Sequence, residues 1–493
     1  MNFYSTRSTK KEGVTAAFAI KNGLAPDGGL YMPEAIPPLT KEDIKALCGM
    51  EYPERAARIL SLYLTDYTEE ELLKDCRAAY AADRFVGGAA PLHEIGDGVF
   101  ALELFHGPTC AFKDMALQIM PRLLSRALKK TGETRTALIL VATSGDTGKA
   151  ALEGYRDIPG IRIQVFYPSE GVSHIQKLQM ITQEGSNVDV CGIYGNFDDA
   201  QSGVKRIFSD KEIAALLNDK NVFLSSANSI NWGRLAPQIA YYVSAYCDML
   251  NAGKIQEGEP IDVTVPTGNF GNIFAAYLAK KMGVPIRRLI CASNSNNVLT
   301  DFIESGVYNR CRPFHMTVSP SMDILISSNL ERLLYVLFGA EKTANWMKNL
   351  NENGSYSLAE EELAQIREHF VAFCCSEEET AEALLHSFQK HGYLMDTHTA
   401  VGYGATLQYL EKEKGRVPVV VASTASPYKF APAVLSALRE TAGNDVSVLQ
   451  QLSSFTGTEI PRPLCGLSDK AILHPDAIDP KTMAERVLAF AQK

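Results

Sequence analysis

Short apolar runs alternate with amphipathic helical segments through the middle of the chain. Three runs, "TALILVAT" at 136–143, "IRIQVFYP" at 161–168 and "NVDVCGIYG" at 187–195, are each followed by a segment with apolar residues at helical spacing. The same alternation returns at "IDVTVP" and "RVPVVVAST". Apolar strands separated by helices are typical of parallel sheets covered on both faces. The pattern therefore predicts an α/β protein.

The flanking regions follow other patterns. Residues 1–95 combine turn signals, notably "GLAPDGGLYMP", with helical stretches such as 53–62, which indicates a separate N-terminal unit. A strand is expected at 99–105, followed by a helix interrupted by Pro121. Residues between about 340 and 395 are expected to be helical, including the pair Cys374 and Cys375.

Composition narrows the function to small-molecule chemistry. The 493 residues suggest two or three domains, and the net charge of -9 without a Lys/Arg run argues against nucleic acid or anionic lipid as a partner. We find neither a signal-peptide core at the start nor an apolar run long enough to cross a bilayer, so a cytoplasmic protein is expected. The ten cysteines lack a CxxC pair and the nine histidines lack HExxH, which favours reduced thiols and no metal site.

Two loops lie between a predicted strand and a predicted helix, where α/β proteins bind ligands. "TSGDTGK" at 143–149 lacks the glycines of a nucleotide-binding loop, but its hydroxyls suit a small carboxylate and Asp146 suits a cation. "TGNFGN" at 267–272 offers free N–H groups to a monophosphate. Either loop could instead be an ordinary helix-capping turn.

Lys113 lies in "GPTCAFKD" at 107–114, between Phe112 and an apolar helical run. Partial burial lowers the pKa of a lysine and makes it a nucleophile toward carbonyls. Without context, a surface lysine beside Asp114 is the plainer interpretation. Combined with a monophosphate loop and the strand-end hydroxyl of Thr424, the lysine indicates a pyridoxal phosphate site.

Five blocks resemble the threonine synthase family. They are "HGPTCAFKDMALQ", "TSGDTGKAALEG", "SSANSINWGRLAPQ", "PTGNFGN" and "STASPYKF", and the likeness extends to "YSTRS" and "GLAPDGGLYMP" near the N-terminus. The resemblance implies a fold type II pyridoxal phosphate enzyme, similar to the tryptophan synthase β chain, with two open α/β lobes around a cleft. The expected parts are an N-terminal unit at 1–95, a large cofactor-binding domain at 96–127 and 236–493, and a small domain at 128–235.

The resemblance also implies roles for individual residues. Lys113 is expected to form the Schiff base with pyridoxal 5'-phosphate and to act as the catalytic base, with Phe112 packed beside it. The remaining cofactor-binding residues are expected to be Asp146 near the ring 3'-oxygen, Thr424 at the ring nitrogen, and Gly268, Asn269, Phe270, Gly271 and Asn272 around the phosphate. The expected substrate-binding residues are Thr143, Ser144, Thr147, Asn228, Ser229, Asn231 and Arg234.

The implied reaction converts O-phospho-L-homoserine and water into L-threonine and phosphate by γ-elimination and β-hydration. The same residues would serve a phospho-lyase or dehydratase that releases 2-oxobutyrate. A non-catalytic cofactor-binding scaffold is less consistent with Lys113, because phosphate binding alone requires no Schiff base. Ser426 stands where many relatives have histidine, and His106 either lines the site or is structural. A monomer or homodimer is expected.

Overall fold

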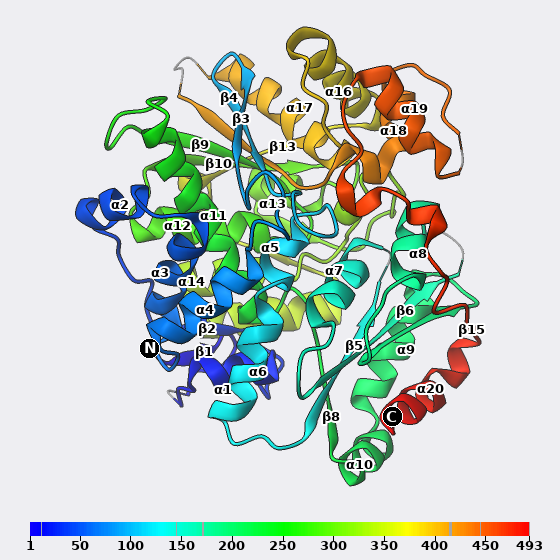
Figure 1. Ribbon diagram of the computed structural model, residues 1–493. Coiled ribbons are helices and arrows are strands. Elements are labelled where there is room, and N and C mark those ends of the chain that lie inside the picture. The colour runs from blue at the N-terminus through cyan, green and yellow to red at the C-terminus, as the bar shows by residue number, and fades with distance from the viewer. Residues whose placement is uncertain (11, 144, 170–171, 414–416, 444, 493) are drawn as a thin grey trace.

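The computed structural model describes residues 1–10, 12–143, 145–169, 172–413, 417–443 and 445–492. Its helices and strands form two α/β lobes and an N-terminal unit (Figure 1). Within the described ranges, no helix is long and apolar enough to cross a membrane.

A six-stranded sheet forms the core of the larger lobe, and all neighbouring strands are parallel except the edge pair β3–β4. Its order across the sheet is β13 (Phe370–Cys374), β10 (Ile286–Ser293), β9 (Ile261–Pro266), β14 (Val419–Ser423), β4 (Val99–Glu103) and β3 (Leu92–Gly96). Strands β9 and β14 are buried along their whole length, as expected for central parallel strands. Both α12 (Gly271–Met282) and α17 (Thr397–Lys412) pack against β9 and β10.

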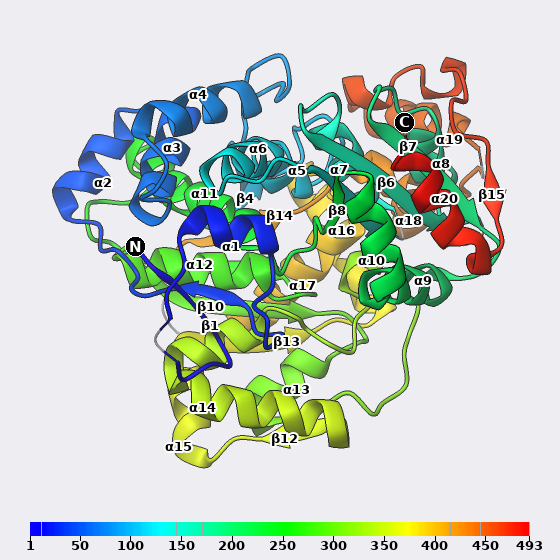
Figure 2. The same ribbon diagram turned by 90° about the horizontal axis from the view of Figure 1, so that it is seen from below.

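A five-stranded parallel sheet forms the core of the smaller lobe. Its order is β15 (Ala477–Ile478), β7 (Val188–Ile193), β6 (Ile161–Pro168), β5 (Thr136–Ala142) and β8 (Val222–Ser225). Its helices are α7 (Asp146–Tyr155), α8 (His174–Ile181), α9 (Phe197–Ser209), α10 (Lys211–Asp219) and α20 (Met483–Phe490). Figure 2 shows α20 beside α9 and α10, so the end of the described chain belongs to this lobe.

The remaining elements surround the larger sheet. The N-terminal unit contains β1 (Phe3–Ser5), α1 (Ala16–Asn22), β2 (Tyr31–Pro33), α2 (Lys41–Cys48), α3 (Tyr52–Tyr63) and α4 (Glu69–Ala79). The other elements are α5 (Lys113–Leu117), α6 (Met120–Lys130), α11 (Trp232–Asn251), α13 (Val298–Ser305), β11 (Val307–Asn309), α14 (Leu330–Asn353), β12 (Ser355–Ser357), α15 (Glu360–His369), α16 (Glu377–His391), α18 (Ala431–Ala437) and α19 (Ser447–Thr456). Short 3-10 helices occur at η1 (Pro320–Met322), η2 (Pro427–Phe430), η3 (Arg462–Leu464), η4 (Leu467–Asp469) and η5 (Pro480–Thr482).

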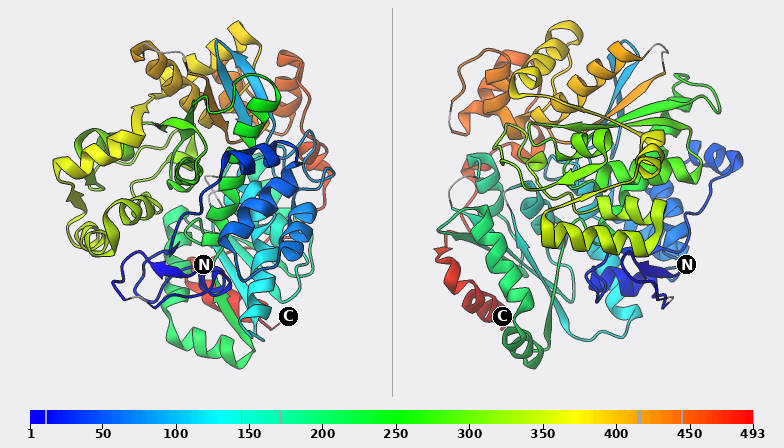
Figure 3. Two further views of the ribbon diagram at one scale, coloured as in Figure 1. Left: turned by 90° about the vertical axis from the view of Figure 1, so that its left-hand side faces the viewer. Right: turned by 180° about the vertical axis from the view of Figure 1, so that it is seen from behind.

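The helix α11 joins these parts. It packs against α2 and α3 of the N-terminal unit and against α5 and α12. Figure 3 shows the blue helices of the N-terminal unit beside green helices of the larger lobe. Most of its 20 residues are buried, which matches its apolar character on all sides. The contact between α5 and α7 is equally close, because a Cβ added at Gly154 would lie 1.9 Å from the backbone oxygen of Leu117. Only glycine allows that approach.

Three observations differ from the sequence predictions. The region expected to be helical between 340 and 395 contains the strand β13, so Cys374 ends an edge strand. Residues 477–490 join the small sheet, although 236–493 was assigned to the large domain. The boundary expected at 95 falls inside the β3–β4 hairpin. In the first two cases a pairing partner distant in sequence decides the structure, and local periodicity does not report it.

Candidate active site

Main-chain pairing places Lys113 next to the end of β14. The N–H of Phe112 donates to the oxygen of Thr424 at 2.7 Å, and the N–H of Ser426 donates to the oxygen of Cys110 at 3.0 Å. Ala111 and Ala425 form the bridge between these bonds. The lysine therefore starts α5 directly beside the strand end that presents Thr424, and both side chains are buried.

Polar groups surround the amine of Lys113. Its Nζ lies 3.6 Å from Asp146 Oδ2 and donates to Ser321 Oγ at 3.1 Å, while the Phe112 ring centroid is 4.9 Å away. Burial lowers the pKa of Lys113, and the nearby Asp146 only partly opposes this. A lowered pKa makes the neutral, nucleophilic amine more available near neutral pH.

Asp146 is held by a second lysine that the sequence analysis did not consider. Lys429 Nζ lies 2.7 Å from Asp146 Oδ1, and Gln176 Nε2 donates to the same oxygen at 2.8 Å. Burial alone would raise the pKa of Asp146, but Lys429 and Lys113 outweigh it and hold the pKa below its usual range. Asp146 is therefore a permanent carboxylate between two amines.

The loop at 267–272 has the features of an anion cradle. In the part of the chain that the structure describes, the backbone N–H groups of residues 268–272 have no acceptor. The Asn272 Oδ1 accepts from Tyr241 and Tyr242, while its buried Nδ2 has no partner. Phe270 adopts a left-handed conformation with φ of 61° and is the N-cap residue that directly precedes α12. Unpaired donors at a helix start suit a phosphate group.

Residues 319–329, which we call the covering segment, pack over this loop. Ser327 Oγ donates to the oxygen of Gly268 at 2.7 Å, and the N–H of Asn329 donates to the oxygen of Asn269 at 3.1 Å. A Cβ added at Gly268 would lie 2.6 Å from the oxygen of Ser321. The covering segment thus occupies the carbonyl side of the loop and leaves its N–H groups free.

A buried histidine fixes the covering segment. His398 Nε2 accepts from the N–H of Ser321 at 3.1 Å, and His398 Nδ1 lies 2.7 Å from Asp396 Oδ2. Because Nε2 is the acceptor, the proton lies on Nδ1 and is donated to Asp396. Asp396 also caps α17. A chain of contacts therefore runs from α17 through His398 and Ser321 to Lys113.

The turn at 143–149 uses part of its own polar groups. Thr143 Oγ1 accepts from the N–H groups of Gly145 and Gly148, at 3.0 and 2.9 Å. Thr147 is half-buried in the first turn of α7. Ser144 lies outside the described residues. The Thr143 hydroxyl therefore stabilises the turn by accepting these two hydrogen bonds. It contributes to a ligand site through the shape of the turn and not as a free hydroxyl.

Arg234 is the charged residue of the 228–234 block. It is buried, its terminal nitrogen donates to the oxygen of Ala227, and its Nε has no partner. Burial lowers the pKa of Arg234 to about 10, and its charge also acts on Lys113. No carboxylate pairs with it among the described residues. A buried guanidinium without an acidic partner is suited to binding an anion.

The other candidate residues of this block are less available to bind a ligand. Asn231 caps α11 through its Oδ1 and donates from Nδ2 to the oxygen of Ile20 at 2.8 Å, so its amide is fully used. Ser229 accepts from Asn329 Nδ2 at 3.4 Å, and Asn228 is exposed. Asn231 therefore connects the N-terminal unit to the site.

Two further residues have structural contacts. His106 Nε2 lies 2.7 Å from Glu103 Oε2. Ser426 caps η2 by accepting from the N–H of Tyr428 at 3.4 Å. These contacts account for both side chains.

Sequence reasoning missed Lys429, Ser321 and His398. Lys429 lies inside the quoted block "STASPYKF", and asking which cation a buried Asp146 requires could have indicated it. His398 lies in "DTHTA", where the capping pattern around Asp396 was a usable signal. No local pattern marks Ser321, because its contacts come from residues distant in sequence.

Family models match nearly the whole chain. The matched models are described as threonine synthase N terminus at residues 2–80, pyridoxal-phosphate dependent enzyme at 85–424, and threonine synthase C-terminal at 399–470. The fold and the lysine site therefore define a pyridoxal phosphate-dependent enzyme of fold type II.

Named relatives and solved structures narrow the class. Threonine synthase of Pseudomonas aeruginosa is 38% identical over 443 residues, covering 88% of this chain and 90% of that protein. Threonine synthase-like 1 of Homo sapiens is 41% identical over 469 residues, covering 91% of this chain. The chain spans only 62% of that human protein.

Two crystal structures agree in overall shape. The pyridoxal phosphate-bound threonine synthase of Brucella melitensis is 37% identical, with a TM-score of 0.88 and full coverage of both chains. The yeast threonine synthase is 34% identical, with a TM-score of 0.89 and 99% coverage of each chain. The chain belongs to the threonine synthase family, and its cofactor is pyridoxal phosphate.

Proposed function

We propose that this chain is a threonine synthase, a lyase of threonine biosynthesis that converts O-phospho-L-homoserine and water into L-threonine and phosphate. The observation that supports this substrate most is Arg234, a buried guanidinium without a carboxylate partner close to Lys113. The 267–272 loop offers a second anion site of different chemistry, built from backbone N–H groups. Two anion sites around one lysine suit a phosphorylated substrate and a phosphorylated cofactor.

The residues present fit the cofactor. Residues 268–272 would hold its phosphate, Thr424 its ring nitrogen, and Lys113 its aldehyde carbon. Asp146 would lie at the ring 3'-oxygen, and Phe112 would pack beside the amine. Bound there, pyridoxal phosphate supplies an electron sink that makes C–H bonds next to the substrate nitrogen acidic.

The chain's own residues would divide the remaining work. Lys113 Nζ would remove the α-proton, because burial lowers its pKa and so favours the neutral amine that can accept a proton. Asp146, paired with Lys429, would remain a carboxylate beside that amine and stabilise its positive charge when it accepts the proton. Arg234 would bind the leaving phosphate, with Ser229 and Asn228 beside it. The α7 N-terminus, with Thr147 and Ser144, would receive the substrate carboxylate.

A phospho-lyase that releases 2-oxobutyrate is the second candidate. The relatives include proteins named threonine synthase-like 1 as well as proteins named threonine synthase, at 41% and 38% identity, so their names do not decide the product. Every residue assigned above would serve either reaction, so only the product separates the two.

Product analysis tests the proposal directly. Purified protein loaded with pyridoxal phosphate is incubated with O-phospho-L-homoserine and followed by proton and phosphorus NMR. We expect threonine and phosphate in equal amounts, with activity abolished in Lys113→Ala. Formation of 2-oxobutyrate in place of threonine would support the lyase, and turnover that persists in Lys113→Ala would contradict the role of the lysine.

The proposed role of Arg234 is tested by comparing its effect on kcat/KM with its effect on the affinity for pyridoxal phosphate. Arg234→Gln removes the charge proposed to bind the substrate phosphate, so we expect kcat/KM to fall by about 10²-fold or more, as for a lost charge-assisted contact. The affinity for pyridoxal phosphate should change little, because that phosphate lies on the other anion site. An equal loss of cofactor affinity would assign Arg234 to the cofactor.

The remaining sequence expectations stay proposals. We propose an N-terminal unit, a large lobe and a small lobe as the domains, with residues 477–490 moved to the small lobe. A cytoplasmic location and a monomer or homodimer are predictions from the sequence.

A further inference from the structure

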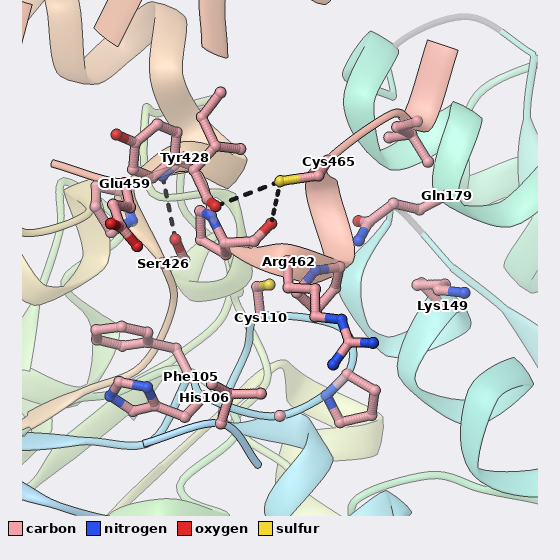
Figure 4. Close-up of a pocket in the computed structure, with 18 of the residues that line it drawn as sticks. Phe105, His106, Cys110, Lys149, Gln179, Ser426, Tyr428, Glu459, Arg462 and Cys465 are labelled. Carbon is pink, nitrogen blue, oxygen red and sulfur yellow. Dashed lines mark hydrogen bonds between the residues drawn. The ribbon is translucent and has the colours of Figure 1, made fainter. Parts of the chain in front are cut away.

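A second cavity lies between the lobes, apart from the lysine site. Its volume is about 1030 Å³, which is within the range of small-molecule sites. Lys149 and Gln179 line it from α7 and α8, while His106, Ser426 and Arg462 line it from the larger lobe and the C-terminal region (Figure 4). Lys113, Asp146, Thr424 and the 267–272 loop do not line it.

Gln179 is the feature that packing does not explain. Its side chain is only 2% exposed, yet neither Nε2 nor Oε1 has a hydrogen-bond partner. Figure 4 shows its amide pointing from α8 into the cavity, on the side of Arg462. A buried amide without partners destabilises the fold relative to leucine at the same place, so a ligand group is the partner it is suited to.

The cavity wall has balanced charge. Five basic and five acidic side chains line it. Most are already paired, as Lys149 is with Glu153 at 3.4 Å and Glu103 is with His106 at 2.7 Å. Among the described residues, four charged side chains of the wall have neither a hydrogen bond nor an ion pair with another side chain: Arg462, Lys470, Glu459 and Asp83. Unpaired charges of both signs therefore line the same cavity, among them the cation of Arg462 and the anion of Glu459.

We propose that this cavity binds a free zwitterionic α-amino acid. Arg462 binds its carboxylate, Glu459 binds its ammonium group, and the Gln179 amide supplies a neutral donor and acceptor. A purely anionic ligand such as phosphate would pair with Arg462 but would leave Glu459 without a cationic partner. Since both lobes line the cavity, the bound amino acid contacts both and stabilises one arrangement of the lobes.

Calorimetry on the full chain loaded with pyridoxal phosphate tests this proposal. The probes are the proteinogenic L-amino acids, each binder being compared with its N-acetyl and carboxamide derivatives. We expect at least one amino acid to bind with one site per chain, and both derivatives to bind at least tenfold more weakly. The experiment needs no substrate, so its outcome is independent of the proposed reaction.

Variants locate the binding. Arg462→Gln, Glu459→Gln and Gln179→Leu should each raise Kd at least tenfold, while Arg206→Gln, an exposed charge on α9 outside the cavity, should leave it unchanged. Gln179→Leu should unfold at the same or higher denaturant concentration than the unchanged chain, which separates lost binding from lost folding.

Two measurements exclude the catalytic site as the place where the amino acid binds. Binding to the cavity should persist in Lys113→Ala and should leave the absorption spectrum of the cofactor unchanged. The proposal is overturned if no amino acid binds, if the three cavity variants bind as the unchanged chain does, or if binding is lost in Lys113→Ala.

Discussion

At the scale of single residues, the site is organised by buried charges that depend on one another. Lys429 has a fully buried side chain, and Asp146 is its ion-pair partner. Removing one member of such a pair leaves an uncompensated charge in a region without water, whereas removing both does not. The stability of the fold around Lys113 therefore depends on the pair as a unit.

A double-mutant cycle tests this dependence. Asp146→Asn should lower the free energy of unfolding by about 3–5 kcal/mol, because it leaves Lys429 unpaired. The double variant Asp146→Asn with Lys429→Met should be less destabilised than the sum of the single variants. Urea unfolding of the chain without cofactor measures all four species, and additive effects would contradict the coupling.

The same pair predicts how stability changes with pH. The pKa of Asp146 is lower in the folded protein than in the unfolded chain, where an aspartate titrates near about 4. Its contribution to stability is therefore present above about pH 4 and is lost as the pH falls below that value. Unfolding experiments between about pH 6 and pH 3 should show a steeper acid loss in the unchanged chain than in the double variant.

Residue patterns in the sequence were sufficient to single out Lys113 and the loops at 143–149 and 267–272 as candidates, because each combines unusual residue types within a few positions. They were not sufficient for Lys429 or Ser321. Those residues contact Lys113 or Asp146 across more than 200 positions of sequence. A long-range contact between ordinary residue types leaves no local pattern.

At the scale of elements, the covering segment and the 267–272 loop form one unit. His398 holds the segment, and the segment holds the carbonyl groups of the loop. We expect the effect of changes in either element to appear first as altered cofactor affinity.

Glycine at 268 is required by this contact. In Gly268→Ala the new Cβ would lie 2.6 Å from the backbone oxygen of Ser321, and backbone cannot yield as a flexible side chain can. We expect the affinity for pyridoxal phosphate to fall by about tenfold or more, measured by titration with the cofactor. Gly271→Ala is the matched variant, because its Cβ would only touch Asn329 Nδ2 at 3.4 Å. Equal losses in both variants would argue against the clash.

His398 is a positioning residue in the same unit. His398→Ala removes the acceptor for the Ser321 N–H, so we expect cofactor affinity to fall by about tenfold. His398→Gln retains an acceptor and should restore much of that affinity, which loss of buried volume alone does not predict. If glutamine and alanine behave alike, packing and not the hydrogen bond is the role of His398.

The sequence pattern predicted strands that are buried on both faces and missed the strand β13 at the edge of a sheet. The strand at 136–142 is apolar along its length because sheet and helices bury both faces, so its pattern has no helical alternative. The β13 strand, "FVAFC", lies at the sheet edge between two helices, and its pairing with β10 is what makes it a strand. Edge strands depend on their neighbour more than on their own residues.

At the scale of the whole molecule, the last elements of the chain complete the smaller lobe. Arg486 on α20 contacts Asp189 on β7 at 2.6 Å and Asp476 at 2.8 Å. These ion pairs fasten α20 and β15 to the edge of the five-stranded sheet.

Hydrogen exchange tests whether these ion pairs stabilise the edge of the five-stranded sheet. Arg486→Met should speed amide exchange in β7 and β15 by about tenfold, because the ion pairs that hold the edge are lost. Exchange in β9 and β10 of the larger lobe should not change. Arg206→Met, on the surface of α9 in the same lobe, is the control. Faster exchange in both lobes would show that they unfold as one unit.

The order of strands in the larger sheet also affects how the protein is made. The central strand β14 lies between β9 and β4, and Thr424 follows it directly. During translation, β4 and Lys113 emerge about three hundred residues before their partner strand β14. Until then the residues before α5 cannot form their main-chain bonds to the end of β14, so Lys113 gains its final position only late in synthesis. We therefore predict that the protein retains its cofactor only after most of the chain has been synthesised.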